Sequence, residues 1–222
     1  MRYRNLVVRQ SALMRNRISG LLMEVGAEHA KSKLHGRKYL AQLLTELEET
    51  PDSGKGLPRM SRANLELFQS MQRQLLERLA QDEPLAKRVE LLMTVPAVGV
   101  VTALTWALEV GEPQRFTSVA NAFSYCGLTS AQKSSAGKEY RGPISKQRNK
   151  HLQRVLIEAA KLAPRLGPDL AAIHDREVER GNKNRATLAV ARKLVAYLLA
   201  VDKSGKPFEP RREPAQASET AV

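Results

Sequence analysis

Residues 91–104 read Leu-Leu-Met-Thr-Val-Pro-Ala-Val-Gly-Val-Val-Thr-Ala-Leu. An apolar helix end, a turn from Pro96 to Gly99 and a second apolar helix follow one another here, which is the layout of a helix-hairpin-helix. In such a unit glycine lets the backbone approach a phosphate, and the N–H groups that open the next helix attract the anion. These contacts would hold DNA without reading its sequence. The same pattern fits an ordinary corner between two core helices, and the stretch alone leaves both interpretations open.

The chain before this stretch favours long helices. Apolar residues recur at helical spacing through residues 6–49 and again through 61–80, where Ser61 is the expected N-cap. Two glycines and a proline in residues 52–58 predict a loop between the two parts. We therefore expect a long helical hairpin or coiled coil over residues 1–83, which serves as a spacer or dimerisation arm rather than in catalysis.

The chain after residue 84 predicts a compact helical domain over residues 84–203. Short apolar helices separated by Gly and Pro are expected over 85–94, 100–110, 118–126, 149–163 and 185–201, with no convincing strand among them. Residues 204–222 are rich in Pro and charge and are expected to be disordered. The predicted fold class is all-α.

The charge of the chain points to a polyanionic partner. Its 222 residues contain 36 Lys and Arg against 23 Asp and Glu, a formal net charge of +13. Dispersed cations of this kind favour nucleic acid through counterion release. Aromatic residues make up only 5%, which argues against a single-strand binder built on base stacking. A single cysteine excludes a disulfide framework, and no signal peptide or apolar run of membrane-spanning length is present, so we expect a cytoplasmic protein with no membrane partner.

Residues 127–146 are rich in hydroxyl groups and cations. A serine beside Lys138, Arg141 and Lys146 could attack a phosphodiester, because the cations would stabilise charge on the pentacoordinate phosphorus and lower the pKa of the hydroxyl. The spacing alone favours a plain phosphate-binding turn over a catalytic serine.

Six short runs, in this order and spacing, change that balance. They are VPAVG at 95–99, RFTS at 115–118, YCGL at 125–128, SSAGK at 134–138, GPISK at 142–146 and AVARK at 189–193. Through them, residues 91–200 resemble the C-terminal domain of the insertion-sequence one-ten family of transposases, also called the one-sixteen and nine-oh-two family, which is related to the pilin-gene invertases. Each run alone is weak, and their order together is specific.

The resemblance implies a DNA recombinase with two catalytic parts. One is a RuvC-like domain whose Asp/Glu/Asp/Asp set binds Mg²⁺, and the other is this helical domain with a nucleophilic serine, carried over to Ser135 with Ser134 as the fallback. The serine would form a covalent phosphoserine, which conserves bond energy for rejoining. In the family, an RNA encoded by the element guides the choice of DNA. The implied partners are therefore DNA, a guide RNA, and a second copy of the chain or a full-length transposase.

The chain departs from the family pattern at several positions. Ala97 stands where the family has Gly, Ser130 where it has Pro, Ala136 and Arg148 where it has Gly, and Gln153 where it has Arg. These changes cluster around Ser135, Lys138 and Lys146, which are intact. The residues expected to bind nucleic acid are Gly99, Lys133, Lys138, Arg141, Lys146, Arg148, Lys150 and Arg154.

The acidic domain has no counterpart in the sequence. The chain has five Asp, and none follows an apolar strand of the RuvC-like type. We therefore expect the C-terminal part of a transposase, with no metal site or cofactor of its own and with Mg²⁺ in the missing domain. Such a chain should not cleave DNA by itself. The competing hypothesis is a non-catalytic, basic module that binds DNA or RNA and dimerises.

Two further residues have structural explanations. Cys126 precedes Gly127 at an apolar helix end and is expected to pack in the core rather than act as a nucleophile. Trp106 lies inside an apolar helix and is likewise expected in the core.

Overall fold

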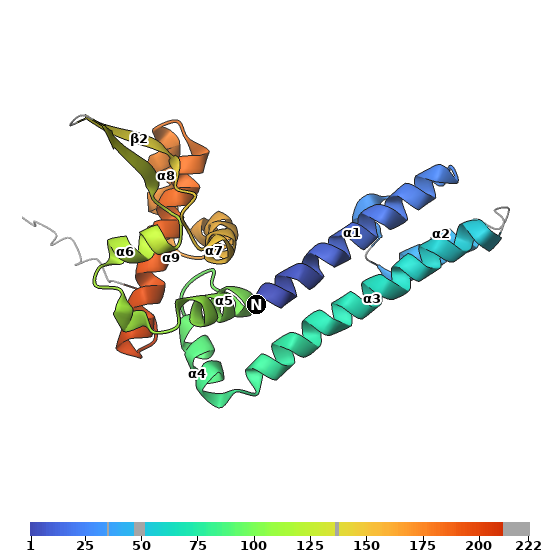
Figure 1. The fold of residues 1–222 in the computed structure, drawn as a ribbon, viewed down its shortest axis with the longest axis horizontal. Coiled ribbons are helices and arrows are strands. Elements are labelled where there is room, and N and C mark those ends of the chain that lie inside the picture. The colour runs from blue at the N-terminus through green and yellow to red at the C-terminus, as the bar shows by residue number, and fades with distance from the viewer. Residues whose placement is uncertain (35, 47–51, 136–137, 211–222) are drawn as a thin grey trace, which may run out of the picture. The chain divides into compact units, whose positions relative to one another are not determined.

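The computed structural model describes residues 1–34, 36–46, 52–135 and 138–210 (Figure 1). The fold is all-α, as predicted, with one short antiparallel hairpin added in the described part. The chain divides into two compact units, Met1–Asp82 and Glu83–Val222. The α-helices are α1 (Arg2–Glu24), α2 (Arg37–Glu46), α3 (Asp52–Ala80), α4 (Glu83–Leu92), α5 (Val100–Val110), α6 (Val119–Tyr125), α7 (Lys150–Leu162), α8 (Pro168–Glu179) and α9 (Lys183–Ser204). Three 3₁₀ turns are η1 (Lys31–Lys33), η2 (Pro113–Arg115) and η3 (Ala163–Arg165), and the strands are β1 (Ser130–Ser135) and β2 (Lys138–Ile144).

In the N-terminal unit, α1 and α3 run antiparallel side by side (Figure 1). The Gln72 amide of α3 donates to Ser11 Oγ of α1 at 3.0 Å, which fixes their register. Leucine and isoleucine side chains from α1, α2, α3 and the end of η1 fill the space between the helices. The buried members of this core are Ile18, Leu22, Leu34, Leu40, Leu43 and Leu65. Burial of this apolar stripe, rather than helix propensity alone, stabilises the arm.

Three details of the N-terminal unit differ from the prediction. The expected loop over residues 52–58 is the beginning of α3, and the expected cap Ser61 lies inside that helix. Pro58 is buried within α3, so packing of its ring offsets the hydrogen bond that proline removes. Leu13, one of the apolar residues that recur at helical spacing through residues 6–49, is 54% exposed.

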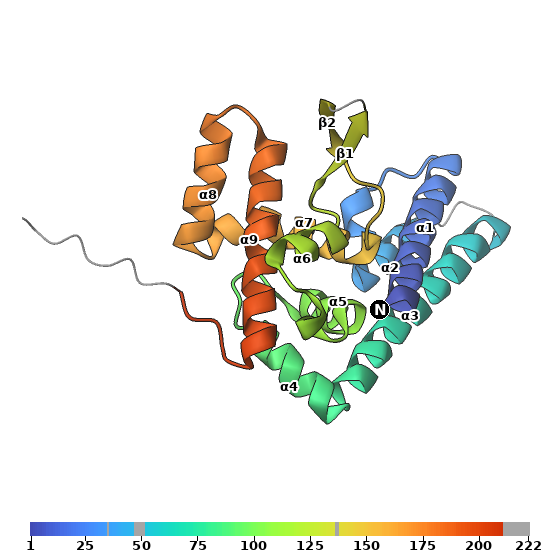
Figure 2. The same ribbon diagram turned by 60° about the vertical axis from the view of Figure 1, so that its left-hand side comes forward.

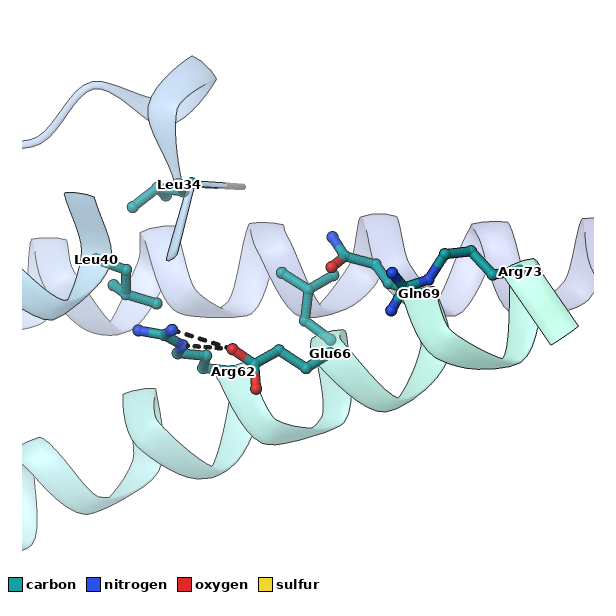
Figure 3. Close-up of a pocket in the computed structure, with 8 residues that line it drawn as sticks. Leu34, Leu40, Arg62, Glu66, Gln69 and Arg73 are labelled. Atoms are coloured by element: carbon teal, nitrogen blue, oxygen red, sulfur yellow. Dashed lines mark hydrogen bonds and ion pairs between the residues drawn. The ribbon is translucent and has the colours of Figure 1, made fainter. Parts of the chain in front are cut away.

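Beside the core of the arm is an open pocket of about 270 Å³ (Figure 3). Leu34, Leu40 and Leu65 contribute its apolar lining. On its rim the Arg62 guanidinium donates to Glu66 Oε1 at 3.0 Å from both Nε and Nη2 (Figure 3). The ion pair offsets the charge of Arg62 at this rim.

The C-terminal unit is built around α9 (Figure 2). This helix contacts α4, α6, α7, α8 and η2. Its buried side chains recur every three or four residues and so cover a broad face. They are Ala186, Val190, Ala191, Leu194, Val195, Leu198, Leu199 and Val201. Helices from across the unit therefore share a single core centred on α9.

A buried carboxylate joins three of these helices. Asp202 on α9, whose side chain is 3% exposed, accepts two bonds of 2.8 Å from the Arg88 guanidinium on α4. The Trp106 indole on α5 donates to the same carboxylate at 2.8 Å. Trp106 is fully buried, as expected, and its polar atom has this partner. The charge of Asp202 is therefore satisfied by two donors from different helices.

The hydroxyl-rich stretch after residue 127 is a β-hairpin rather than the expected loop. β1 and β2 pair antiparallel, with an irregularity between Ser130 and Gln132, and the hairpin stands out from the helices (Figure 2). Its strands have polar sequences without apolar alternation, so the usual strand signal is absent. The hairpin is formed by backbone hydrogen bonds between the strands, and the side-chain pattern does not predict it.

Two other segments were not anticipated. Helix α8 begins with Pro168 in its first turn, where proline's missing N–H costs nothing. At the other end, residues 204–210 do not follow the expectation of disorder. Phe208 N donates to Thr94 Oγ1 at 2.8 Å, and its ring lies 4.6 Å from that of Tyr197. Residues 211–222 lie outside the described part of the chain.

Candidate active site and nucleic-acid interface

The register of the hairpin separates the two candidate serines. Ser135, the last residue of β1, pairs with Lys138, the first of β2. Ser134 pairs with Glu139, one step further along. The serines therefore have cross-strand partners of opposite charge.

The register also groups the residues of the hairpin by face, because residues alternate between faces along a strand and paired residues share one. One set of register positions holds Ser135, Lys138, Lys133 and Tyr140, and the other holds Ser134, Glu139, Gln132 and Arg141. The side chains at 131–135 and 138–141 lie outside what the structure describes. The register thus puts Lys133 and Lys138 at positions of the Ser135 set, and Glu139 and Arg141 at positions of the Ser134 set.

A close backbone corner marks the base of the hairpin. Gly127 has φ +70°, and a Cβ there would come within 2.5 Å of the Arg148 side chain. Ser145 N donates to Thr129 O at 3.0 Å, and Arg148 Nη1 donates to Ser145 O at 2.7 Å. Only glycine combines this φ with so close a neighbour. The two ends of the hairpin are thereby held together beside Arg148.

Helix α7 begins next to this corner and is fixed by Asn149. The Asn149 side chain accepts from His151 N and Leu152 N, and its amide donates to Glu109 Oε2 at 2.7 Å. Asn149 N donates to Tyr125 O at 2.9 Å. One side chain therefore caps α7 and ties it to α5.

An arginine lies over two aromatic rings, one just before α6 and one at its last residue. Arg115 Cζ is 4.3 Å from the Tyr125 ring centroid and 4.6 Å from that of Phe116. The Tyr125 hydroxyl donates to Glu109 O at 2.7 Å. Stacking restrains the exposed guanidinium of Arg115 in one orientation.

Four of the predicted nucleic-acid contacts gather at the start of α7. Lys146, Arg148, Lys150 and Arg154 are all exposed. None of them forms an ion pair with a carboxylate among the described residues. The other predicted cations, Lys133, Lys138 and Arg141, have side chains that lie outside the described part. The four exposed cations thus lie within residues 146–154, at and just before the start of α7.

The turn between α4 and α5 has an unusual backbone. Ala97 has φ +64° and is the only non-glycine residue with positive φ in the described ranges. Gly99 is the N-cap of α5, makes no side-chain cap bond and is exposed. Nothing within 4 Å would meet a Cβ at Gly99. The start of α5 is therefore an exposed backbone with no capping side chain.

The buried cysteine has no nucleophilic character. Cys126 is fully buried, and burial raises the pKa of its thiol from 9.0 to about 12, against the opposing effect of the nearby Arg115 charge. The thiolate is therefore negligible at neutral pH. The prediction that Cys126 packs in the core is confirmed.

The described residues lack two other kinds of feature, a metal site and a membrane-spanning helix. No group of three or more His, Cys, Asp or Glu there could hold a metal ion. In the same part of the chain, no helix combines the length and the apolar character needed to cross a bilayer.

Sequence reasoning missed several residues that position the site. Arg115 and Arg192 lie within the matched runs, but no role was assigned to them. Asn149 could have been found as a capping residue, since it directly precedes the predicted apolar pattern of α7. The bond from Asn149 to Glu109 spans 40 residues, and no local pattern reports it.

Comparison with known proteins identifies the domain. Residues 89–175 match the family model described as "Transposase IS116/IS110/IS902 family". The transposase for insertion sequence element IS1328 of Yersinia enterocolitica is 28% identical over 214 residues, which cover 93% of this chain and 63% of that protein. The transposase for insertion sequence element IS1111A of Coxiella burnetii is 28% identical over 219 residues, covering 90% of this chain and 57% of the relative.

A shorter match adds a further relative. The 43.6 kDa protein of insertion element IS110 of Streptomyces coelicolor is 30% identical over 121 residues, covering 54% of this chain and 30% of that protein. The chain thus spans less than two thirds of each of these relatives. The ordered motif runs, the family match over residues 89–175 and these relatives show that the chain is similar to the IS116/IS110/IS902 transposase family.

Proposed function

We propose that this chain acts in the transposition of an insertion sequence, by holding nucleic acid and presenting Ser135 as the nucleophile. The observation that carries the choice of serine is the register of the hairpin. Ser135 pairs with Lys138, whereas Ser134 pairs with Glu139. A lysine favours the approach of a phosphodiester and charge on its oxygens, and a glutamate opposes both.

The proposed reaction keeps the number of phosphate ester bonds constant. Ser135 Oγ loses its proton and forms a bond to phosphorus, while the bond from phosphorus to the leaving DNA oxygen breaks and that oxygen takes up a proton. A DNA hydroxyl then attacks the phosphoserine, forms a new phosphodiester and returns the proton to the serine. Each step exchanges one phosphate ester for another, so rejoining needs no external energy source.

Two surfaces are proposed to hold the phosphate backbone. One consists of Lys146, Arg148, Lys150 and Arg154, which are exposed and lack ion-pair partners among the described residues. The other is the exposed backbone at Gly99, where the N–H groups at the start of α5 are available, as in a helix-hairpin-helix. Contacts of this kind position nucleic acid without reading its bases. They suit the DNA and guide RNA that the family resemblance implies.

The Mg²⁺ of the family belongs, in this proposal, to the acidic RuvC-like domain. The described residues of this chain do not fit a metal site, because they contain no cluster of candidate ligands. No step is therefore assigned to the ion here. Ser135 with the neighbouring lysine positions is the contribution of this chain.

The helical arm is proposed to associate with a second copy or with a complete transposase. Three residues of one α1 face, Tyr3, Leu6 and Leu13, are 53%, 50% and 54% exposed. A row of exposed apolar residues on a helix is typical of a surface that packs against another helix. Replacing Leu6 and Leu13 by Glu would then shift the mass measured by light scattering toward the monomer.

The test of the serine is a covalent adduct. The purified chain is mixed with Mg²⁺, labelled duplex carrying the ends of the element, the element's RNA, and a complete family transposase whose own nucleophilic serine has been replaced by alanine. We expect a labelled band that contains this chain and survives denaturation. Ser135→Ala should abolish the band, and Ser134→Ala, as the matched control, should leave it.

Other outcomes contradict the proposal. An adduct that persists in Ser135→Ala but is lost in Ser134→Ala would assign the reaction to Ser134. No adduct from the unmodified chain, with nucleic-acid binding indifferent to Ser135→Ala, would support the non-catalytic binding module instead.

A further inference from the structure

Two consecutive backbone carbonyls at the base of the hairpin accept hydrogen bonds from different helices. Gln153 Nε2 of α7 donates to Gly127 O at 2.7 Å. Arg192 Nε of α9 donates to Leu128 O at 2.8 Å. Both acceptors lie within buried residues, where an unpaired carbonyl is costly. These two donors satisfy groups that water reaches poorly.

The N–H groups of the same corner are satisfied by a third helix. Gly127 N donates to Ser124 O, and Leu128 N donates to Phe123 O, both at 2.9 Å and both at the end of α6. Every backbone polar group of residues 127 and 128 therefore has a partner, from α6, α7 or α9. The corner is fixed from three directions, and β1 begins two residues later, at Ser130.

We propose that Arg192 and Gln153 are positioning residues for strand transfer: they clamp the 127–128 corner and thereby set the direction in which the hairpin carries Ser135 out of the domain. The proposal rests on the proposed role of Ser135. Neither residue is assigned a contact with the reacting phosphate. They act through the backbone that leads to β1.

The two donors differ in strength. Arg192 donates from a charged group, which gives a stronger bond to a carbonyl than the neutral Gln153 amide. Loss of Arg192 should therefore loosen the hairpin more than loss of Gln153. Lysine at 192 keeps the charge with a single flexible donor and should rescue part of the effect.

The test is hydrogen exchange of the purified full chain, read by mass spectrometry. In Arg192→Gln we expect backbone amides of residues 129–135, 138–142, 144 and 145 to exchange about tenfold faster or more, and those of α5 to stay unchanged. Gln153→Leu should give a smaller acceleration in the same peptides. The matched control is Lys193→Gln, because Lys193 is the neighbouring cation on α9 and lies over the Tyr197 ring, 5.0 Å from its centroid.

Equal exchange of the hairpin in Arg192→Gln and Lys193→Gln would overturn the clamp. If exchange in Arg192→Gln also accelerates in α5, the substitution has loosened the whole unit, and Gln153→Leu and Arg192→Lys decide instead. If neither of these variants accelerates exchange of the hairpin peptides more than that of the α5 peptides, the clamp is also overturned.

The adduct assay separates the clamp from the proposed function. If the unmodified chain forms the Ser135 adduct, Arg192→Gln should lower its yield about tenfold or more, with nucleic-acid affinity retained and with partial rescue in Arg192→Lys. An unchanged yield would overturn the positioning role while Ser135 stands. If the unmodified chain forms no adduct but the hairpin loosens in the exchange experiment, the proposed function fails and the clamp of the corner stands.

Discussion

Ala97 occupies a backbone conformation that suits glycine. Its φ of +64° is left-handed, in which a Cβ crowds the following carbonyl. Ala97→Gly should therefore raise the free energy of unfolding by up to about 1 kcal/mol, the relief of strain being partly offset by the greater freedom of glycine in the unfolded chain. Urea denaturation of the two proteins checks this. Ala97→Val is the opposing control and should lower stability, and equal stability of all three would contradict the assignment of strain.

Cys126 makes the stability of the domain depend on alkaline pH. The pKa of its thiol is about 12 in the folded chain against an ordinary 9.0, so between these values the unfolded chain loses a proton that the folded chain keeps. The stability that the folded chain gains by keeping this thiol protonated is fully present below pH 9, and it is lost as the pH rises toward 12. Between pH 9.5 and 10.5, the unmodified chain should lose about 1 kcal/mol more unfolding free energy than Cys126→Ala, measured by urea denaturation. Parallel losses in the two proteins would show that Cys126 does not titrate as described.

At the scale of the elements, the contact of α4, α5 and α9 at Asp202 should dominate stability. Asp202→Ala leaves the Arg88 guanidinium, whose side chain is 27% exposed, without its carboxylate. We expect this substitution to lower the free energy of unfolding by about 3 kcal/mol, measured by urea denaturation. The value is at the lower end of the range for breaking a buried ion pair, because Arg88 is partly hydrated. Lys87→Ala is the matched control. Lys87 pairs with Glu83 on the surface of α4, so its substitution should lower the unfolding free energy by about 0.5 kcal/mol or less. Similar losses in both variants would contradict the account.

How far the sequence predicts an element depends on whether its signal is local. Helix α5 was predicted with its observed bounds, because Gly99 and Gly111 flank an apolar run. Helix α7 was predicted within one residue at each end. The hairpin was not, because its polar strands depend on backbone pairing across the turn, which no side-chain periodicity reports.

The same reasoning explains the error at α3 and the contacts that sequence reasoning missed at the site. Gly54 and Pro58 signal a loop locally, but α3 extends through them because its apolar face packs on α1. The choice of Ser135 and its cations follows from the sequence and stays a prediction. The bonds of Gln153 and Arg192 to the 127–128 corner could not be predicted, since they span 26 and 64 residues.

For the whole molecule, binding to nucleic acid should depend steeply on salt. Each phosphate neutralised on duplex DNA contributes about −0.9 to the slope of log affinity against log salt. The double variant Lys150→Gln/Arg154→Gln should therefore reduce the slope by about 1.8, as measured by fluorescence anisotropy. The control is Lys161→Gln/Arg180→Gln, which removes two exposed cations already paired with Glu158 and Glu177. Equal changes in both double variants would show that overall charge, rather than the α7 surface, binds the phosphates.

The central claim is that the hairpin carries the nucleophile on Ser135. The most direct measurement is fragment-ion mass spectrometry of the adduct after nuclease digestion, on the tryptic peptide of residues 134–138, which contains both candidate serines. The account predicts the added nucleotide mass on Ser135 alone. Nucleotide mass on Ser134, or an adduct that maps to a residue outside the hairpin, would contradict it.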